Sequence, residues 1–232
     1  MKRATNRLKS GTGPERPSPG PEGPGGPAAT GSVAPLKFLK KADPVLAAII
    51  ARVGPYKIDY REPTFQTLVR SIVYQQLNGR AALTIFNRLA AAAKADPLTP
   101  ESILRLRPAR MRKLGLSKQK LTYIRELARF TRSGEIDFDL YPALEDAHVI
   151  EHLTRVKGIG VWTAHMFLIF ALRRPDVLPT GDFGVRAAMK KAYNLPEMPK
   201  PEEMERIAAA WRPYCSVAAW YLWRSLENQG TA

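Results

Sequence analysis

From Phe38 onward, the apolar residues of this sequence recur at the spacing of an α-helix. The clearest example is the stripe formed by Phe65, Leu68, Val69, Ile72 and Val73. No segment of about four to eight residues alternates between apolar and polar side chains and is bounded by turns, as a half-buried strand would be. The sequence therefore predicts an all-α protein with two helical lobes in one compact unit.

Residues that begin and end helices separate the apolar segments. Asp43-Pro44 places an N-cap residue before a proline at the first helical position, and Gly54-Pro55 ends that helix. Thr99-Pro100 caps a short helix in the same way. Further signals place helices at residues 81–93, 117–132, 142–153, 161–172, 182–193, 201–211 and 216–226.

The first 35 residues have a different composition, because Gly, Pro and other small residues dominate positions 11–31. Such a segment cannot bury enough apolar surface to offset the entropy lost on ordering. We expect a disordered tail over residues 1–35 and a folded domain over residues 36–232.

The chain carries 36 Lys and Arg residues against 21 Asp and Glu residues, a formal charge of +15. A generally basic soluble protein would also show such an excess, but the excess favours a polyanionic partner, which is DNA, RNA or an acidic membrane surface. No apolar run reaches about 18 residues, so a membrane span is not expected. An apolar N-terminal segment typical of secretion is also missing, and we expect an intracellular protein.

Metal and disulfide chemistry is restricted by the few suitable residues. Cys215 is the single cysteine, which excludes an internal disulfide and Cys-rich zinc or iron–sulfur sites. His148 and His152 are four residues apart, but no Glu follows His148 as in a metalloprotease helix. We interpret these histidines as ordinary helix-face residues.

Gly158-Ile159-Gly160 predicts a hairpin, at about residues 153–164, that leads into the next helix. Glycine permits a positive φ and lacks the Cβ that would block a neighbouring backbone. The first N–H groups of a helix are unpaired and carry partial positive charge, so such a turn can bind phosphate without reading sequence. A tight helix corner packed through its glycines is the alternative explanation.

Five segments together resemble one known family. "LTRVKGIGVWTAHMFLIFAL" and "DVLPTGDFGVRAAMKKAY" resemble the hairpin and catalytic loop of the helix-hairpin-helix (HhH-GPD) DNA glycosylase superfamily. The other three segments resemble its alkylation-repair branch, the 3-methyladenine DNA glycosylase II group: "VYQQLNGRAALTIFNRL", "MRKLGLSKQKLTYIRELA" and "AWRPYCSVAAWYLWRS". The resemblance spans about Phe38 to Ser225 and implies the two-lobe fold of that family, without the N-terminal β-rich domain of its longer members.

The resemblance implies a monofunctional hydrolase of N-glycosyl bonds that flips out alkylated bases such as 3-methyladenine during base excision repair. Asp182 matches the catalytic acid, although an Asp at that place is also an ordinary helix N-cap. A carboxylate there would stabilise the positive charge that develops on the sugar. Strand-nicking members have a lysine where this chain has Trp162, so water is expected to be the nucleophile.

The resemblance also implies roles for further residues. Trp162, Trp223, Met166 and Tyr74 are expected in the base pocket, where Met166 replaces an aromatic residue and makes the pocket roomier. Gln76 or Leu77 is expected to fill the space left in the duplex. The residues expected at the DNA backbone are Lys157, Gly158, Ile159, Gly160, Thr163 and Arg186, with Lys118 and Lys120 as weaker candidates.

No cofactor is expected to be required, and no iron–sulfur cluster. The resemblance implies a monovalent cation (Na or K) bound by the carbonyls of Thr154, Val156 and Ile159. Damaged double-stranded DNA is the expected partner of a monomer, in the bacterial nucleoid or the eukaryotic nucleus according to the source. Two alternatives remain: a non-catalytic helix-hairpin-helix DNA-binding module, and a glycosylase for oxidised or mismatched bases.

Overall fold

The computed structural model describes residues 33–227, which form helices and connecting segments without a strand. The expected tail over residues 1–32 lies outside the described part of the chain. The α-helices are α1 (Val33–Ala42), α2 (Pro44–Val53), α3 (Phe65–Tyr74), α4 (Gly79–Ala93), α5 (Pro100–Arg105), α6 (Pro108–Lys113), α7 (Lys118–Ser133), α8 (Asp146–Thr154), α9 (Val161–Phe170), α10 (Phe183–Ala192), α11 (Pro201–Ala208) and α12 (Cys215–Glu227). Two 3₁₀ turns, η1 (Tyr141–Ala143) and η2 (Ala209–Trp211), complete the set. The predicted all-α class is confirmed.

Side-chain caps fix several of these helix starts. Asp43 accepts hydrogen bonds from the first turn of α2, and Asn78 does the same for α4. Thr99 and Ser102 form a reciprocal capping box at the start of α5. These side chains satisfy N–H groups that a helix leaves unpaired, which is why the start signals in the sequence were informative.

Two helix boundaries differ from the sequence-based expectation. α1 begins at Val33, inside the segment assigned to the tail. Pro142 opens only a 3₁₀ turn, because Leu144 is extended and α8 starts two residues later. The short helix expected after Thr99 is α5, and the helix expected to end at Leu114 is α6, which Pro108 begins after the extended Leu106.

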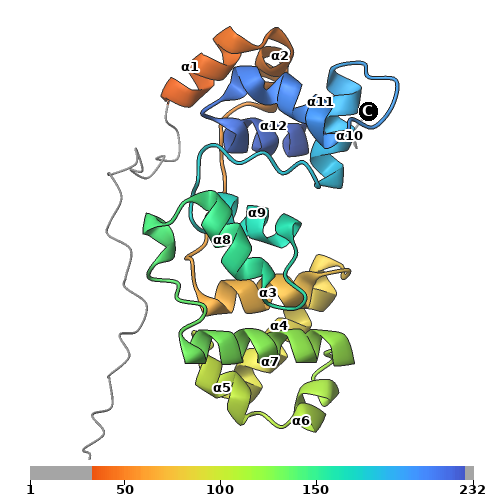
Figure 1. The fold of residues 1–232 in the computed structure, drawn as a ribbon. Coiled ribbons are helices and arrows are strands. Elements are labelled where there is room, and N and C mark those ends of the chain that lie inside the picture. The colour runs from red at the N-terminus through yellow and green to blue at the C-terminus, as the bar shows by residue number, and fades with distance from the viewer. Residues whose placement is uncertain (1–32, 228–232) are drawn as a thin grey trace, which may run out of the picture.

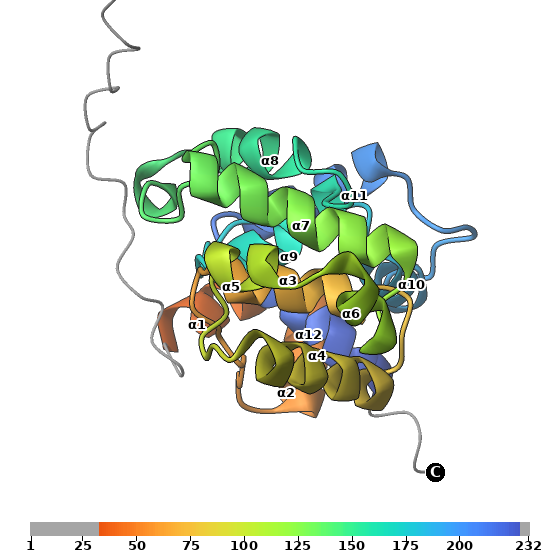
Figure 2. The ribbon, with the colours of Figure 1, turned by 90° about the horizontal axis from the view of Figure 1, so that it is seen from below.

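The helices form two lobes, with α8 and α9 between them (Figure 1). One lobe contains α3 to α7, and in the view from below α7 runs along it with α5 and α6 beside it (Figure 2). The other lobe combines the first two helices with α10, α11 and α12. The buried hydrophobic residues form one continuous cluster through both lobes, so the lobes share a core.

The buried carboxylate of Asp43 connects the start of the second lobe with residues much later in the chain through hydrogen bonds. Oδ1 of Asp43 caps α2, and Oδ2 accepts hydrogen bonds from the Tyr193 hydroxyl and from Nε1 of Trp211 at 2.8 Å. Burial and the contact with Asp43 raise the pKa of Tyr193, so the phenol remains a donor. Trp211 is fully buried, as expected for a core residue.

Candidate active site

Asp182 lies at the start of α10, and its carboxylate accepts three hydrogen bonds. Oδ1 accepts from the backbone N–H of Val185 and from Nε1 of Trp223, both at 2.8 Å. Oδ2 accepts from Nε1 of Trp162 at 2.6 Å. The residue is only 8% exposed, so these donors replace most of its hydration. The cap role and a chemical role can therefore coexist in one carboxylate whose orientation is fixed by α9, α10 and α12.

Gly184 allows this arrangement, and the sequence had not singled it out. A Cβ at position 184 would lie 3.0 Å from Cδ1 of Trp223 and 3.1 Å from Oδ1 of Asp182. Contacts that short are too close for ordinary carbon packing. Glycine therefore lets the Trp223 indole approach the first turn of α10 closely enough to donate to the carboxylate.

A cavity of about 350 Å³ lies beside Trp223, between α3, α9 and α12. Met166 and Phe170 line it from α9, and Thr67 and Ser71 line it from α3. Phe170 stacks on Trp223 with ring centroids 5.7 Å apart. Apolar and aromatic side chains share the lining with hydroxyl groups and with the charged side chains of Asp59, Arg61, Arg224 and Glu227, which suits a planar organic ligand with polar edges.

Of the four residues expected in the base pocket, Met166 and Trp223 line this cavity, whereas Trp162 and Tyr74 do not. Trp162 instead donates to Asp182 and is 44% exposed. The Arg70 guanidinium lies 4.3 Å from the centre of the Tyr74 ring. These two aromatic rings therefore have other partners in this structure.

The two hairpin glycines have different structural reasons. Gly158 has a φ of 92°, and a Cβ there would lie 2.0 Å from Cδ2 of Tyr123 on α7. Gly158 is therefore required by the fold. A Cβ at Gly160 would meet nothing within 4 Å, and its φ of −93° suits any residue. Packing in the protein therefore does not require glycine at position 160, which is the N-cap residue of α9, and the open space there would let another backbone approach closely.

The turn around Gly160 leads directly into α9, which begins without a side-chain cap. The N–H groups of its first turn, including that of Thr163, have no partner within the helix. The side chain of Thr163 is buried, so only its N–H can contact a ligand. The side chain of Ile159 is buried, and in this structure its N–H donates to the carbonyl of Val156.

The loop between α3 and α4 presents both residues expected to act as a wedge. Gln76 is exposed with a φ of 56°, and Leu77 is 40% exposed. Gln75 holds this loop against the hairpin, because its Nε2 donates to the carbonyl of Gly158 at 2.9 Å. The structure therefore places the wedge loop and the hairpin side by side.

Lys120 holds the same loop from α7. Its Nζ donates to the carbonyls of Val73 at 2.7 Å and Gln75 at 2.6 Å. Partial burial lowers the pKa of this amine. In this structure Lys120 therefore stabilises the end of α3, where a cation suits the helix dipole.

The other basic candidates remain accessible to different degrees. Lys157 is exposed in the hairpin, and Lys118 is exposed at the first position of α7. Nε of Arg186 donates to the carbonyl of Pro199 at 3.0 Å, and the side chain is half-buried. Phe183, next to Asp182, is 74% exposed, and the sequence had not indicated it as a surface residue.

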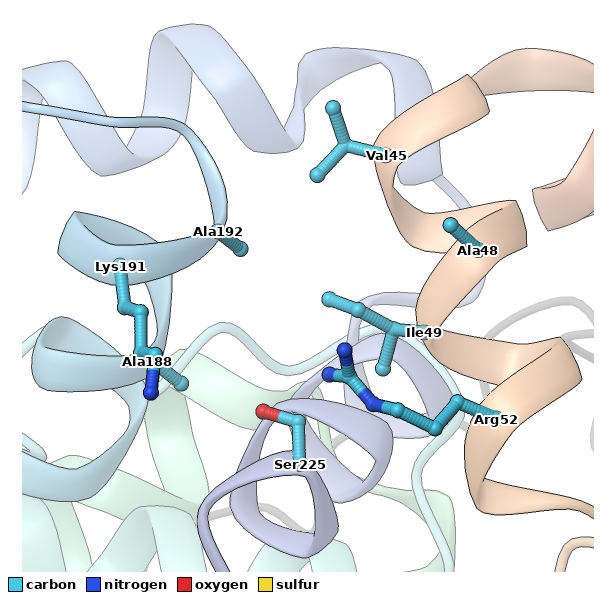
Figure 3. A pocket seen from close by; sticks show the side chains of 8 residues that line it. All are labelled: Val45, Ala48, Ile49, Arg52, Ala188, Lys191, Ala192 and Ser225. Carbon is cyan, nitrogen blue, oxygen red and sulfur yellow. The ribbon is translucent and has the colours of Figure 1, made fainter. Parts of the chain in front are cut away.

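A second pocket of about 380 Å³ lies between α2, α10 and α12 (Figure 3). Arg52 and Lys191 line it from opposite sides, Arg52 near Ile49 on α2 and Lys191 near Ala188 on α10 (Figure 3). It borders the second half of α10 and shares no lining residue with the cavity beside Trp223. It therefore forms no part of the candidate active site.

Within residues 33–227, no group of three or more His, Cys, Asp and Glu side chains is placed to hold a metal ion. Over the same residues, no helix has the length and apolar character needed to cross a membrane.

Comparisons with known proteins give a consistent result. The sequence model of the HhH-GPD superfamily base excision DNA repair proteins matches residues 69–213. DNA-3-methyladenine glycosylase 1 of Schizosaccharomyces pombe is 34% identical over 188 residues, which cover 76% of this chain and 80% of the relative.

Two solved structures are similar in fold and in sequence. A DNA-3-methyladenine glycosidase from Bacillus halodurans superposes with a TM-score of 0.76 and 36% identity, covering 84% of this chain and 90% of the other. A 3-methyladenine DNA glycosylase of Schizosaccharomyces pombe in complex with abasic DNA gives a TM-score of 0.73 and 32% identity, covering 83% and 96%.

Proposed function

This chain belongs to the HhH-GPD superfamily of base excision DNA repair proteins, and we propose that it is a monofunctional DNA glycosylase that releases alkylated bases from DNA. One observation carries the proposal for this chain's own residues. Asp182 is held by two indole N–H groups beside a cavity large enough for a base, and position 162, which provides one of those groups, is a tryptophan.

Asp182 supplies the charge that this reaction needs. Cleavage of the N-glycosidic bond transfers the bonding electrons to the leaving base and creates positive charge on the sugar. The buried Asp182 carboxylate stabilises that charge, and its fixed donors avoid a large reorganisation during the reaction. A water molecule then bonds to the sugar carbon and loses a proton. The proposed acceptor of this proton is the Asp182 carboxylate. The product is an abasic site.

Trp162 supports hydrolysis without strand cleavage. A Schiff base with the sugar requires an amine nucleophile, and an indole N–H cannot serve as one. In this structure the Trp162 N–H instead donates to Asp182. We therefore propose that the enzyme uses water and leaves the phosphodiester backbone intact.

The cavity beside Trp223 is the proposed base pocket. A glycosylase must extrude its nucleotide from the duplex to reach the glycosidic bond. Trp223 lines this cavity and also donates to Asp182, and on the proposed function a base in the cavity would place its sugar near the carboxylate. An alkylated purine can carry positive charge, and aromatic faces attract cations. The thioether of Met166 adapts to ligands of different shape, which favours a broad substrate range.

The hairpin and the wedge loop are the proposed DNA contacts next to the lesion. The free N–H groups at the start of α9, with Gly160 and the exposed Lys157, suit a phosphate group. Leu77 is the better-placed wedge by chemistry, because an exposed apolar side chain can stack against the bases that flank the gap.

We also propose the monovalent cation at the hairpin. Thr154 is the last residue of α8, where helix carbonyls are unpaired and the dipole favours positive charge. The carbonyl of Val156 accepts only the N–H of Ile159 among the backbone bonds of residues 33–227, and carbonyl oxygens suit hard cations. With the carbonyl of Ile159 as the third oxygen, the residues fit such an ion. A cation there would add positive charge beside the phosphate site.

The test is base release from methylated duplex DNA under single-turnover conditions, with the wild type and Asp182→Asn compared. We expect release by the wild type, a loss of at least about 100-fold in the variant, and strand breakage only after alkali treatment. Equal release by both proteins would remove Asp182 from the mechanism. Tight binding without any release by the wild type would identify a non-catalytic DNA-binding module, and spontaneous strand breakage would contradict the monofunctional assignment.

A further inference from the structure

A run of the chain without acidic residues joins α5 to α7. Residues 102–125 contain no Asp or Glu and eight Lys or Arg residues. Two of these basic side chains are engaged inside the protein: Lys120 binds the end of α3, and Nη1 of Arg125 donates to the carbonyl of Leu106 at 2.9 Å. The other six form what we call the basic segment: Arg105, Arg107, Arg110, Arg112, Lys113 and Lys118.

The basic segment is exposed and has no internal counter-charge. All six side chains are exposed, and within residues 33–227 none of them makes an ion pair or a side-chain hydrogen bond. Acidic partners do neutralise basic residues elsewhere in the protein, for example Asp176 and Glu205 at Arg212. Like charges so close together repel one another, so an external polyanion would be strongly attracted to this surface.

A chain of hydrogen bonds connects the basic segment to the proposed lesion site. The carbonyl of Gly158 in the hairpin accepts from Gln75, and the carbonyl of Gln75 accepts from Lys120 in the first turn of α7. Lys118 precedes Lys120 by two residues, and α6 lies beside the start of α7. Figures 1 and 2 show α6 and the start of α7 on the same side of the molecule as the hairpin and the start of α10.

We propose that the basic segment binds the phosphates of duplex DNA outside the lesion site. This inference rests on the proposed function, because it takes the duplex to be gripped at the hairpin. A duplex presents one charge per about 1.7 Å of its axis, whereas α6 is about 9 Å long, so several phosphates face a helix of this length. The lobe formed by α3 to α7, which provides no hydrogen-bond donor to Asp182, thereby extends the DNA contact and contributes affinity without sequence preference.

The experiment uses two duplexes that carry a central abasic-site analogue. The short duplex has about one helical turn, about 10 base pairs, and the long one about 30 base pairs. The variant is Arg107→Ala/Arg110→Ala/Arg112→Ala. The matched control removes three exposed lysines of α1, at the opposite end of the molecule in Figure 1, as Lys37→Ala/Lys40→Ala/Lys41→Ala. Both variants lose three charges at exposed positions, and circular dichroism checks that they remain folded.

The arginine variant is expected to bind the long duplex at least about tenfold more weakly, and the slope of log K against log salt should fall by about 2 to 3. On the short duplex, its affinity should equal that of the wild type, and so should its rate of base release from a methylated duplex of the same length. The α1 control should bind both duplexes as the wild type does.

Three results would overturn the inference: unchanged affinity of the arginine variant for the long duplex, an equal loss on both duplexes, or an equal loss in the α1 control. An acidic protein as the true partner would give the first of these. The failure of the proposed function is distinguishable, because the wild type would then release no base from methylated duplexes of either length.

Discussion

Nε1 of Trp223 donates to Oδ1 of Asp182 at 2.8 Å, across a first helical turn in which residue 184 is glycine. The indole comes from α12 and the carboxylate from the start of α10, so the last helix of the described chain orients the proposed catalytic group. The second indole, that of Trp162, comes from α9. The site is therefore sensitive to small shifts between three helices.

Gly184→Ala is expected to slow base release by about 10- to 100-fold, because the new Cβ would push Trp223 away from Asp182. The control is Gly181→Ala, since a Cβ there meets nothing within 4 Å. Single-turnover release and thermal unfolding measure the two effects. Equal rates for both variants would show that the approach of Trp223 is irrelevant to the chemistry.

Trp223→Phe and Trp162→Phe each keep an aromatic ring and remove one donor to Asp182. A hydrogen bond to a charged group contributes about 1.5 to 3 kcal/mol, which corresponds to a rate loss of about 10- to 100-fold. The loss should be smaller for Trp162→Phe, because Trp162 is 44% exposed and water can replace its N–H. Affinity for abasic-site DNA serves as the control measurement, and a loss of affinity equal to the loss of rate would contradict this explanation.

Substitutions of the two hairpin glycines should separate an effect on stability from an effect on DNA binding. Gly160→Ala is expected to leave the melting temperature unchanged, since a Cβ there meets nothing in the protein, and to weaken binding of abasic-site DNA. Gly158→Ala is expected to lower the melting temperature as well, through the clash with Tyr123 and the positive φ of 92°.

The double variant Gly158→Ala/Tyr123→Ala provides a check on the cause. It should regain part of the stability lost by Gly158→Ala, because the clash is gone while the strained φ remains. Strong binding by Gly160→Ala would indicate that no backbone approaches this residue.

Acidification should destabilise the fold through His165. Burial lowers the pKa of His165, and the negative charge of Glu205 opposes this only in part. The unfolded chain therefore takes up a proton at a higher pH than the folded protein does. The stabilisation that the buried, neutral His165 contributes is therefore fully present above the pKa of about 6.5 that histidine has in the unfolded chain. It is lost as the pH falls through the pKa of His165 in the folded protein.

His165→Gln should remove this part of the pH dependence, whereas the same change at the exposed His148 should not. Denaturant unfolding between about pH 7 and about pH 5 measures the difference. Parallel stability curves for the wild type and His165→Gln would contradict the assignment.

Local signals in the sequence predicted most of the helices, because their causes lie within a few residues. Asp43, Asn78, Thr99 and Asp182 each cap the helix that follows them. The start of α1 was missed, since the Gly- and Pro-rich composition before it continues without a clear cap to Val33.

Contacts between distant segments could not be read from the same signals. Lys120 looked like an exposed charge beside Lys118, but the packing of α7 against α3 turns it toward two carbonyls. Gly184 looked like an unremarkable helix residue until α12 placed an indole against it. The family resemblance indicated Asp182 and the hairpin, whereas the donors that orient Asp182 required the structure.

The carboxylate of Asp43, which accepts from Tyr193 and Trp211, has a consequence for biosynthesis. On the ribosome, the first two helices emerge long before the residues that satisfy this acid have been translated. The middle of the chain can build its own lobe during that interval, because its helices are consecutive. The lobe that completes the Asp182 site closes only when the nascent chain is nearly finished, so an interrupted polypeptide cannot acquire the reaction centre.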